Sequence, residues 1–86
     1  MIGADLTGLD LSGFDLSGFD LTGANLTRVD LSGADLFQAD LTEANLTETI
    51  LTWSNMTEAN VGGANLTGAK LTDVIGADLT GALTDS

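Results

Sequence analysis

Carboxylates are the side chains of this sequence that could do chemistry. Thirteen Asp and Glu residues stand against two Lys and Arg, which gives the 86-residue chain a formal charge of −11. Paired carboxylic acids can cleave glycosidic bonds, but one acid of such a pair must lie in a pocket that raises its pKa. The sequence has no His, Cys or Tyr, so imidazole and thiol catalysis, disulfides and His/Cys metal sites are excluded. The chemistry open to the carboxylates therefore depends on the element that positions them.

That element is an internal repeat of five residues. An aliphatic centre recurs at every fifth position from Leu6 to Leu71, and it is leucine in twelve of fourteen units. Asp or Asn precedes the centre in twelve units, Ser or Thr follows it in twelve, and a small residue, usually Ala, stands two positions before it. Four positions of every unit are therefore constrained, as expected for a repeat architecture. The exceptions are Met56 and Val61 at the centre, Ile50 and Lys70 before it, and Phe37 and Gly62 after it.

A period of five fits neither a helix nor a continuous strand. On a helix each centre would advance about 140° around the axis, and along a strand successive centres would point to opposite sides. A chain that bends once in every five residues solves this problem, because each bend aims the next centre at the same axis. The spacing therefore predicts stacked coils at the spacing of β-strands, about 4.8 Å.

The units resemble those of the pentapeptide-repeat family. The resemblance rests on Ala-Asp-Leu-Thr-Gly (4–8), Ala-Asn-Leu-Thr-Arg (24–28), Ala-Asp-Leu-Thr-Glu (39–43) and Ala-Asn-Leu-Thr-Gly (64–68), and it extends from residue 4 to about residue 73. It implies an all-β fold, a right-handed quadrilateral β-helix with twenty residues per coil and about four coils. We expect a single domain over 1–86, with regular repeats at 4–73, a register break at 73–76 and an irregular end at 77–86.

A twenty-residue coil would stack aspartates on the surface. It places Asp10 over Asp30, Asp15 over Asp35 and Asp20 over Asp40, with about one charge per 2 Å of axis against about one per 1.7 Å in B-DNA. The resemblance adds that some pentapeptide-repeat proteins mimic DNA and occupy the DNA-binding saddle of gyrase. The alternative interpretation is that the repeat itself demands Asp or Asn at this position and that the acidic surface is simply solvated.

Apolar residues interrupt the polar exterior in the middle of the chain. Phe37, Ile50 and Trp53 form a candidate interaction patch, because aromatic side chains are favoured anchors of protein interfaces. Single exposed apolar residues are also common and need no function. Three acids are expected to form a polar rim to this patch, and one of them, Glu48, is expected to pair with Arg28 in the coil below. The rim residues are Glu43, Glu48 and Glu58.

Both ends of a solenoid expose unpaired backbone. Large residues replace the small one three times in the first coil, where they would plug the open end or contact another chain end to end. Leu71 is followed by Leu79, eight residues later, which we interpret as a three-residue insertion that forms a bulge or loop. We expect one end of the tube to mediate self-association. The candidate end contacts are Leu9, Phe14, Phe19, Val74 and Ile75.

The predicted function is non-catalytic. We expect a structural or protein-interaction solenoid with an acidic, flat-sided surface, no catalytic residues, no cofactor and no metal. A DNA mimic directed at gyrase or another DNA-binding protein is the alternative. A charge of −11 would repel nucleic acid and anionic membranes, so the expected partner is an unidentified protein or a second copy joined end to end. No signal peptide is visible after Met1, which leaves the cytoplasm as the default location.

Overall fold

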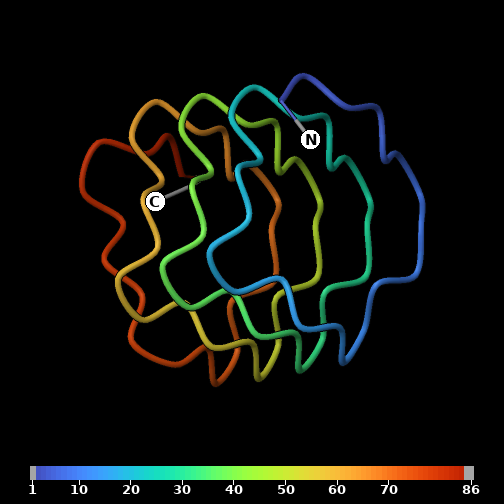
Figure 1. Cartoon of the computed structure of the whole chain (residues 1–86), viewed down its shortest axis with the longest axis vertical. Helices are drawn as coiled ribbons and strands as arrows, with labels where there is room; N and C mark the ends of the chain where they lie inside the picture. The colour runs from blue at the N-terminus through green and yellow to red at the C-terminus, as the bar shows by residue number, and fades with distance from the viewer. Residues whose placement is uncertain (1, 85–86) are drawn as a thin grey trace.

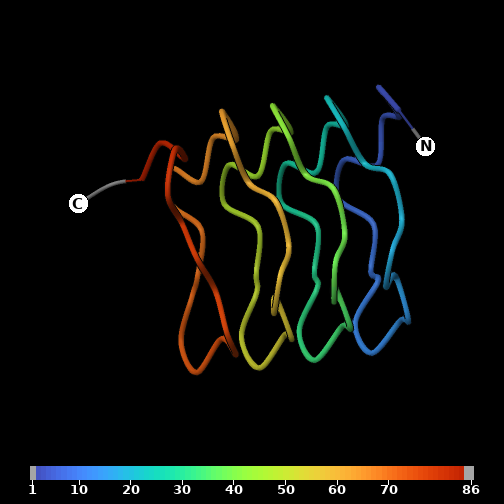
Figure 2. The ribbon, with the colours of Figure 1, turned by 60° about the vertical axis from the view of Figure 1, so that its left-hand side comes forward.

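The chain winds into a short solenoid whose coils stack in the order of the sequence (Figure 1). This computed structural model describes residues 2–84, and the Cα positions extend over 26 × 21 × 21 Å. The first coil (blue) and the last coil (red) form opposite ends of the stack (Figure 2). These two ends are the places where a coil lacks a neighbouring coil on one side.

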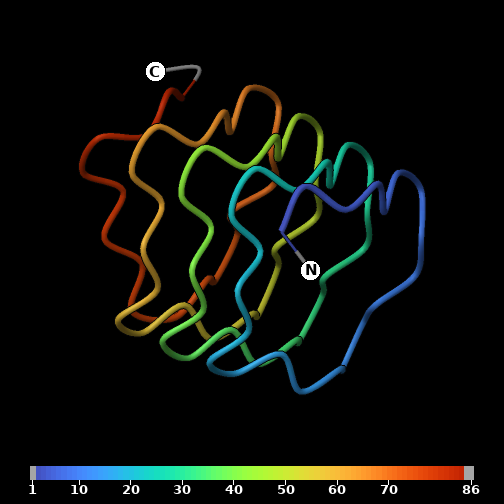
Figure 3. The ribbon, with the colours of Figure 1, turned by 45° about the horizontal axis from the view of Figure 1, so that its top comes forward.

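Twenty residues separate the paired positions of neighbouring coils. Parallel single-residue bridges join Asp5 to Asn25 and continue in steps of five residues to the bridge between Asn55 and Ile75. Each coil therefore has four bridging sides, and Figure 3 shows the stacked coils with the top of Figure 1 turned toward the viewer. Within residues 2–84 there is no helix and no strand longer than one bridging residue. We name the sides by their bridging residues: face 1 (Asp5, Asn25, Asn45, Asn65), face 2 (Asp10, Asp30, Ile50, Lys70), face 3 (Asp15, Asp35, Asn55, Ile75) and face 4 (Asp20, Asp40, Asn60).

Three backbone hydrogen bonds per side join one coil to the next, two at the bridging residue and one from the corner N–H, such as Arg28 to Thr47 at 3.0 Å. On face 1, the Leu26 N–H donates to the carbonyl of Asn45 at 2.7 Å, and the Asn45 N–H donates back to the carbonyl of Ala24 at 2.9 Å. The C=O and the N–H of each bridging residue thus both bond to the preceding coil. The bonds lie between coils, so an end coil leaves one set of them unmade.

The repeat centres fill the tube. Leu26, Leu46 and their equivalents in the middle coils are fully buried, which confirms that the centres share one axis. Small side chains at the position two before the centre are buried beside them, and they must be small because four inward groups crowd each coil. Burial weakens toward the ends, where Leu11 and Leu71 are only partly buried.

A residue with positive φ forms every corner. Glycine holds this place in the first coil, as at Gly13 (φ 71°), but seven non-glycine residues adopt the same left-handed conformation. The corner geometry is therefore imposed by the stacked coils even where the side chain opposes it. The seven residues are Arg28, Gln38, Glu43, Glu48, Trp53, Glu58 and Asp73, with φ between 56° and 65°.

The last coil is shorter than the others, which corrects the expected three-residue insertion. Ile75 still bridges Asn55 in the regular register, twenty residues away, whereas the next pair joins Asn65 to Leu83, only eighteen residues away. The interval from Leu71 to Leu79 is thus two repeats that lack two residues, and the coil contracts after Ile75.

No helix in residues 2–84 is long and apolar enough to cross a membrane.

Candidate functional site

The aspartates on the four faces are held in place by their own repeat. Oδ1 of Asp15 accepts hydrogen bonds from the N–H of Ser17 at 3.0 Å and from its hydroxyl at 2.7 Å. Asp10 makes the same pair of bonds with Ser12. These bonds stabilise the ionised form and so lower the pKa of both carboxyls below the ordinary value. The bond from the hydroxyl contributes most, and the bond from the N–H comes next. These side chains are therefore fixed in orientation and ionised at neutral pH.

The predicted stacking of aspartates is confirmed, but each stack is two residues deep. Bridges join Asp10 to Asp30 on face 2, and the equivalent pairs form on faces 3 and 4. In the third coil the same faces carry Ile50, Asn55 and Asn60. The ladder carboxylates are thus gathered in the first two coils and spread around the stack, and in residues 2–84 no group of three or more acids could hold a metal ion.

The N-terminal end of the tube is open and apolar. Leu9, Phe14 and Phe19 remain 46%, 53% and 41% exposed, and they surround a hollow of about 320 Å³. The hollow is continued inward by the first leucine centres, and Asp15 also lines it. Large side chains at the small position thus line the end of the tube without closing it. We call these three residues with their hollow the mouth; its deeper lining is Leu6, Leu11, Leu16 and Leu21.

Carboxylates and unpaired backbone groups surround the mouth. Asp5, Asp10, Asp15 and Asp20 stand one on each face of the first coil, and all are exposed; we call them the acidic rim. In the second coil the N–H and C=O of Asp30 both bond to the first coil. The same groups of Asp10 and Asp15 make none of the backbone hydrogen bonds. The mouth therefore combines an apolar centre, a ring of negative charge and free strand-edge groups.

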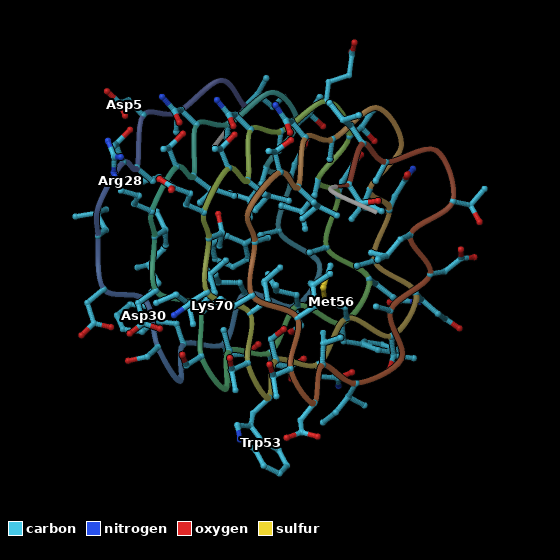
Figure 4. The ribbon with its side chains drawn as sticks, turned by 180° about the vertical axis from the view of Figure 1, so that it is seen from behind. Asp5, Arg28, Asp30, Trp53, Met56 and Lys70 are labelled. Carbon is cyan, nitrogen blue, oxygen red and sulfur yellow. The ribbon has the colours of Figure 1, made fainter. Side chains whose placement is uncertain are left out.

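The candidate patch of Phe37, Ile50 and Trp53 is divided between two corners. Trp53 is 63% exposed and stands away from the body at the corner between faces 2 and 3 (Figure 4). Ile50 bridges on face 2 and is partly buried, whereas Phe37 follows face 3 and is 37% exposed. One whole face separates Phe37 from Trp53, so the three do not form one surface.

The three glutamates that were expected to surround that patch are also dispersed. Glu58 lies one coil above the corner of Phe37 and accepts a hydrogen bond from Gln38 at 2.8 Å, while Glu43 lies on another corner. Glu48 lies on a third corner and pairs with Arg28 at 3.3 Å, which confirms the predicted ion pair between coils. Both partners of that pair are more than half exposed, so it contributes at most about 1 kcal/mol.

The C-terminal candidates belong to the last regular coil. Val74 is partly buried and packs against the core, while Ile75 is 50% exposed on face 3. Leu83, which sequence analysis did not single out, is 59% exposed beside Asn65. This end therefore also exposes apolar side chains.

Sequence analysis missed the polar residues of the core. Thr49 and Ser54 are fully buried at the small position, with Val29 one coil below Thr49. The Thr49 hydroxyl donates to the carbonyl of Leu26 at 2.8 Å, whereas the Ser54 hydroxyl has no partner. Their place two before the centre is the signal that could have identified them.

Comparison with known proteins agrees with this geometry. The family description Pentapeptide repeats matches residues 1–36 and 34–73, in 8 copies. The chain belongs to the pentapeptide-repeat family. No curated protein matches it.

Solved pentapeptide-repeat structures share its fold. Rfr23 from the cyanobacterium Cyanothece 51142 is 36% identical with a TM-score of 0.62, over 98% of this chain and 58% of its own. A protein of the Arabidopsis thaliana thylakoid lumen is 38% identical with a TM-score of 0.57, over 94% of this chain and 65% of its own. A third, from Nostoc PCC 7120, is 32% identical with a TM-score of 0.56, over 98% and 83%. The chain thus spans less than two thirds of the length of the first two.

Proposed function

We propose that this right-handed, four-sided pentapeptide-repeat solenoid is a non-catalytic protein-interaction module that binds its partner through the mouth. The observation that carries the proposal is the hollow of about 320 Å³ between half-exposed Leu9, Phe14 and Phe19. Exposed aromatic side chains around a concavity are favoured anchors for a protein partner.

A protein partner can be tested by substitution at the mouth. The tagged chain would be used to capture proteins from an extract of cells that express it, with and without competitor DNA. We expect Phe14→Asp to abolish capture of the specific partner and Trp53→Ala to leave it unchanged, because only the first lies at the hollow. Circular dichroism would confirm that both variants fold. Capture that survives Phe14→Asp but fails with Trp53→Ala would move the contact to the corner and overturn the proposal.

A DNA mimic is the second candidate, supported by the aspartate pairs stacked on faces 2, 3 and 4. Against it, each stack is two residues deep and the charge is spread around the tube, whereas B-DNA carries about one charge per 1.7 Å along its whole axis. A mimic should inhibit supercoiling by gyrase in a salt-sensitive way. Charge reversal at Asp30 and Asp35 should abolish that inhibition, while Phe14→Asp should leave it intact.

A further inference from the structure

The chemistry around the mouth restricts what can occupy it. Asp15 lies beside Phe14 and is one of the residues that line the hollow, while its backbone N–H and C=O make none of the backbone hydrogen bonds between coils. An occupant must therefore supply an apolar group for the hollow, hydrogen bonds for a strand edge and compensation for the acidic rim. A buried carboxylate or an unpaired edge group without such partners would oppose binding.

Charge argues against a second copy of this chain. Two mouths placed face to face would oppose two rims of four carboxylates. In a head-to-tail arrangement the mouth would meet the last coil, where Asp73 and Asp78 outnumber Lys70. Each copy also carries a net charge of −11, so long-range repulsion acts against every orientation. The complementary partner is a basic one.

The strand edge indicates the conformation of that partner. On each side of a middle coil, a buried small residue, a less buried bridging residue and a buried centre follow one another, as at Ala24, Asn25 and Leu26, which is the alternation of an extended chain. A partner segment that adds to the edge at Asp15 would place one side chain in the hollow and the next above the rim. Within the chain, Arg28 and Glu48 already form an ion pair across one coil step at 3.3 Å, so this spacing suits a cation beside a carboxylate.

We propose that the mouth binds an extended segment of another protein in which apolar residues alternate with Lys or Arg, added as a further rung along face 3, on the N-terminal side of Asp15. This inference rests on the proposed function and specifies its partner. Strand addition supplies hydrogen bonds, the hollow selects the apolar side chain, and the acidic rim selects its charged neighbours.

Synthetic peptides test each part of the inference. The probe is a fluorescein-labelled peptide with alternating Leu and Lys; two further peptides replace every Lys with Glu or every Leu with Ser. We expect one-to-one binding of the Leu–Lys peptide in fluorescence anisotropy and none of the other two. Asp10→Asn with Asp15→Asn should weaken binding at least about fivefold, as expected for two lost surface ion pairs. Asn preserves the local hydrogen bonds, as it does at Asn25 and Asn45.

A matched control separates the rim from general acidity. Glu43→Gln with Glu58→Gln removes the same charge at corners away from the mouth and should change binding less than about twofold. Equal weakening by both double variants would reduce the interaction to unspecific attraction and overturn the proposal. Phe14→Ala should also weaken binding, and a peptide that binds equally well without Phe14 would overturn it too.

Two further results would distinguish this proposal from the proposed function. If the Glu-containing peptide bound as well as the Leu–Lys peptide, and Phe14→Ala abolished both, the mouth would remain the site but the basic partner would be wrong. If sedimentation showed dimers that Phe14→Asp dissociates, the occupant would be a second copy and the inference would fail.

Discussion

At the scale of the residue, a side-chain hydrogen-bonding pattern explains the repeated Asp/Asn and Ser/Thr. The carboxylate or amide Oδ1 accepts the N–H two residues later and, where that residue is Ser or Thr, its hydroxyl, as Asn45 does from Thr47 at 3.1 and 2.6 Å. The bonds satisfy backbone donors at a bend, where no coil contact is available to them. Asp and Asn serve this purpose equally well, so the charge at a given face is not fixed by the fold.

Acid should destabilise the fold through these aspartates. Hydrogen bonds from the following Ser or Thr hydroxyl, and then from its N–H, lower the pKa of five carboxyls. A lowered folded-state pKa stabilises the fold above the unfolded value of about 3.9, and this stabilisation disappears as pH falls through the lower folded value. We expect a constant thermal midpoint above about pH 5 and a decline below about pH 4. The five are Asp5, Asp10, Asp15, Asp40 and Asp78.

Thermal unfolding followed by circular dichroism between pH 2 and 7 measures this effect. The double variant Asp10→Asn/Asp15→Asn should be less sensitive to acid, since Asn keeps the hydrogen bonds but cannot be protonated in this range. A midpoint that rises on acidification would mean that relief of repulsion between stacked aspartates outweighs the loss of these bonds.

The two buried hydroxyls should respond in opposite directions to removal. Thr49 donates to Leu26, so Thr49→Val should lower the free energy of unfolding by about 1 kcal/mol. Ser54 is buried without a partner, so Ser54→Ala should raise it by up to about 1 kcal/mol. Urea denaturation provides both values. Equal destabilisation by the two substitutions would show that packing, and not hydrogen bonding, sets their effect.

At the scale of the element, the corner is the feature that sequence analysis left unexplained. The period of five predicts a bend in each unit, and the frequent Gly is consistent with one. The sequence does not reveal that the second turn residue is left-handed, because Glu48 and Trp53 stand there as readily as Gly13. Neighbouring coils fix this conformation through hydrogen bonds from the corner N–H, such as Glu48 to Thr67 at 2.9 Å. Those bonds are non-local and have no signature within one unit.

Backbone conformation should therefore reverse the usual order of Ala and Gly at a corner. Trp53→Ala and Trp53→Gly lose the same side-chain packing, but Gly adopts the φ of 65° without strain. We expect the Gly variant to be more stable than the Ala variant by about 1 kcal/mol in urea denaturation. In the same corner column, Gly33→Ala should be destabilising by about 1 kcal/mol, because φ is 67° and no atom lies close enough to clash. An Ala variant at 53 that is the more stable one would contradict a strained corner.

At the scale of the whole molecule, the twenty-residue register governs what the five-residue repeat could and could not predict. It correctly pairs Asp10 with Asp30 and Arg28 with Glu48 in neighbouring coils. It fails after Ile75, because an eight-residue interval can be one repeat with three added residues or two repeats with two removed. The bridge from Asn65 to Leu83 decides for the second. The mouth was likewise foreseen only as three large residues, since whether a side chain fills or merely surrounds the axis depends on packing in three dimensions.

The stacked charges make the stability of the whole solenoid dependent on salt. Pairs such as Asp10 and Asp30 are held one coil apart, within the Debye length of about 10 Å at 0.1 M salt but beyond that of about 3 Å at 1 M. At pH 7 we expect the thermal midpoint to rise by several degrees between these salt concentrations. Asp30→Asn with Asp35→Asn removes one charge from each of two stacks and keeps the shape of the repeat. This variant should be more stable than the parent at low salt and should gain less from added salt.

A control of equal charge assigns the effect to the stacks. Glu43→Gln with Glu58→Gln changes the net charge by the same amount at corners where no carboxylate lies directly below or above. Its salt response should stay close to that of the parent. Repulsion between distant charges is already largely screened at 0.1 M salt, whereas repulsion between carboxylates in neighbouring coils is not. If both double variants reduced the salt response equally, net charge and not stacking would limit the stability of the solenoid. In that case the positions of the aspartates on faces 2 and 3 would carry no energetic cost of their own.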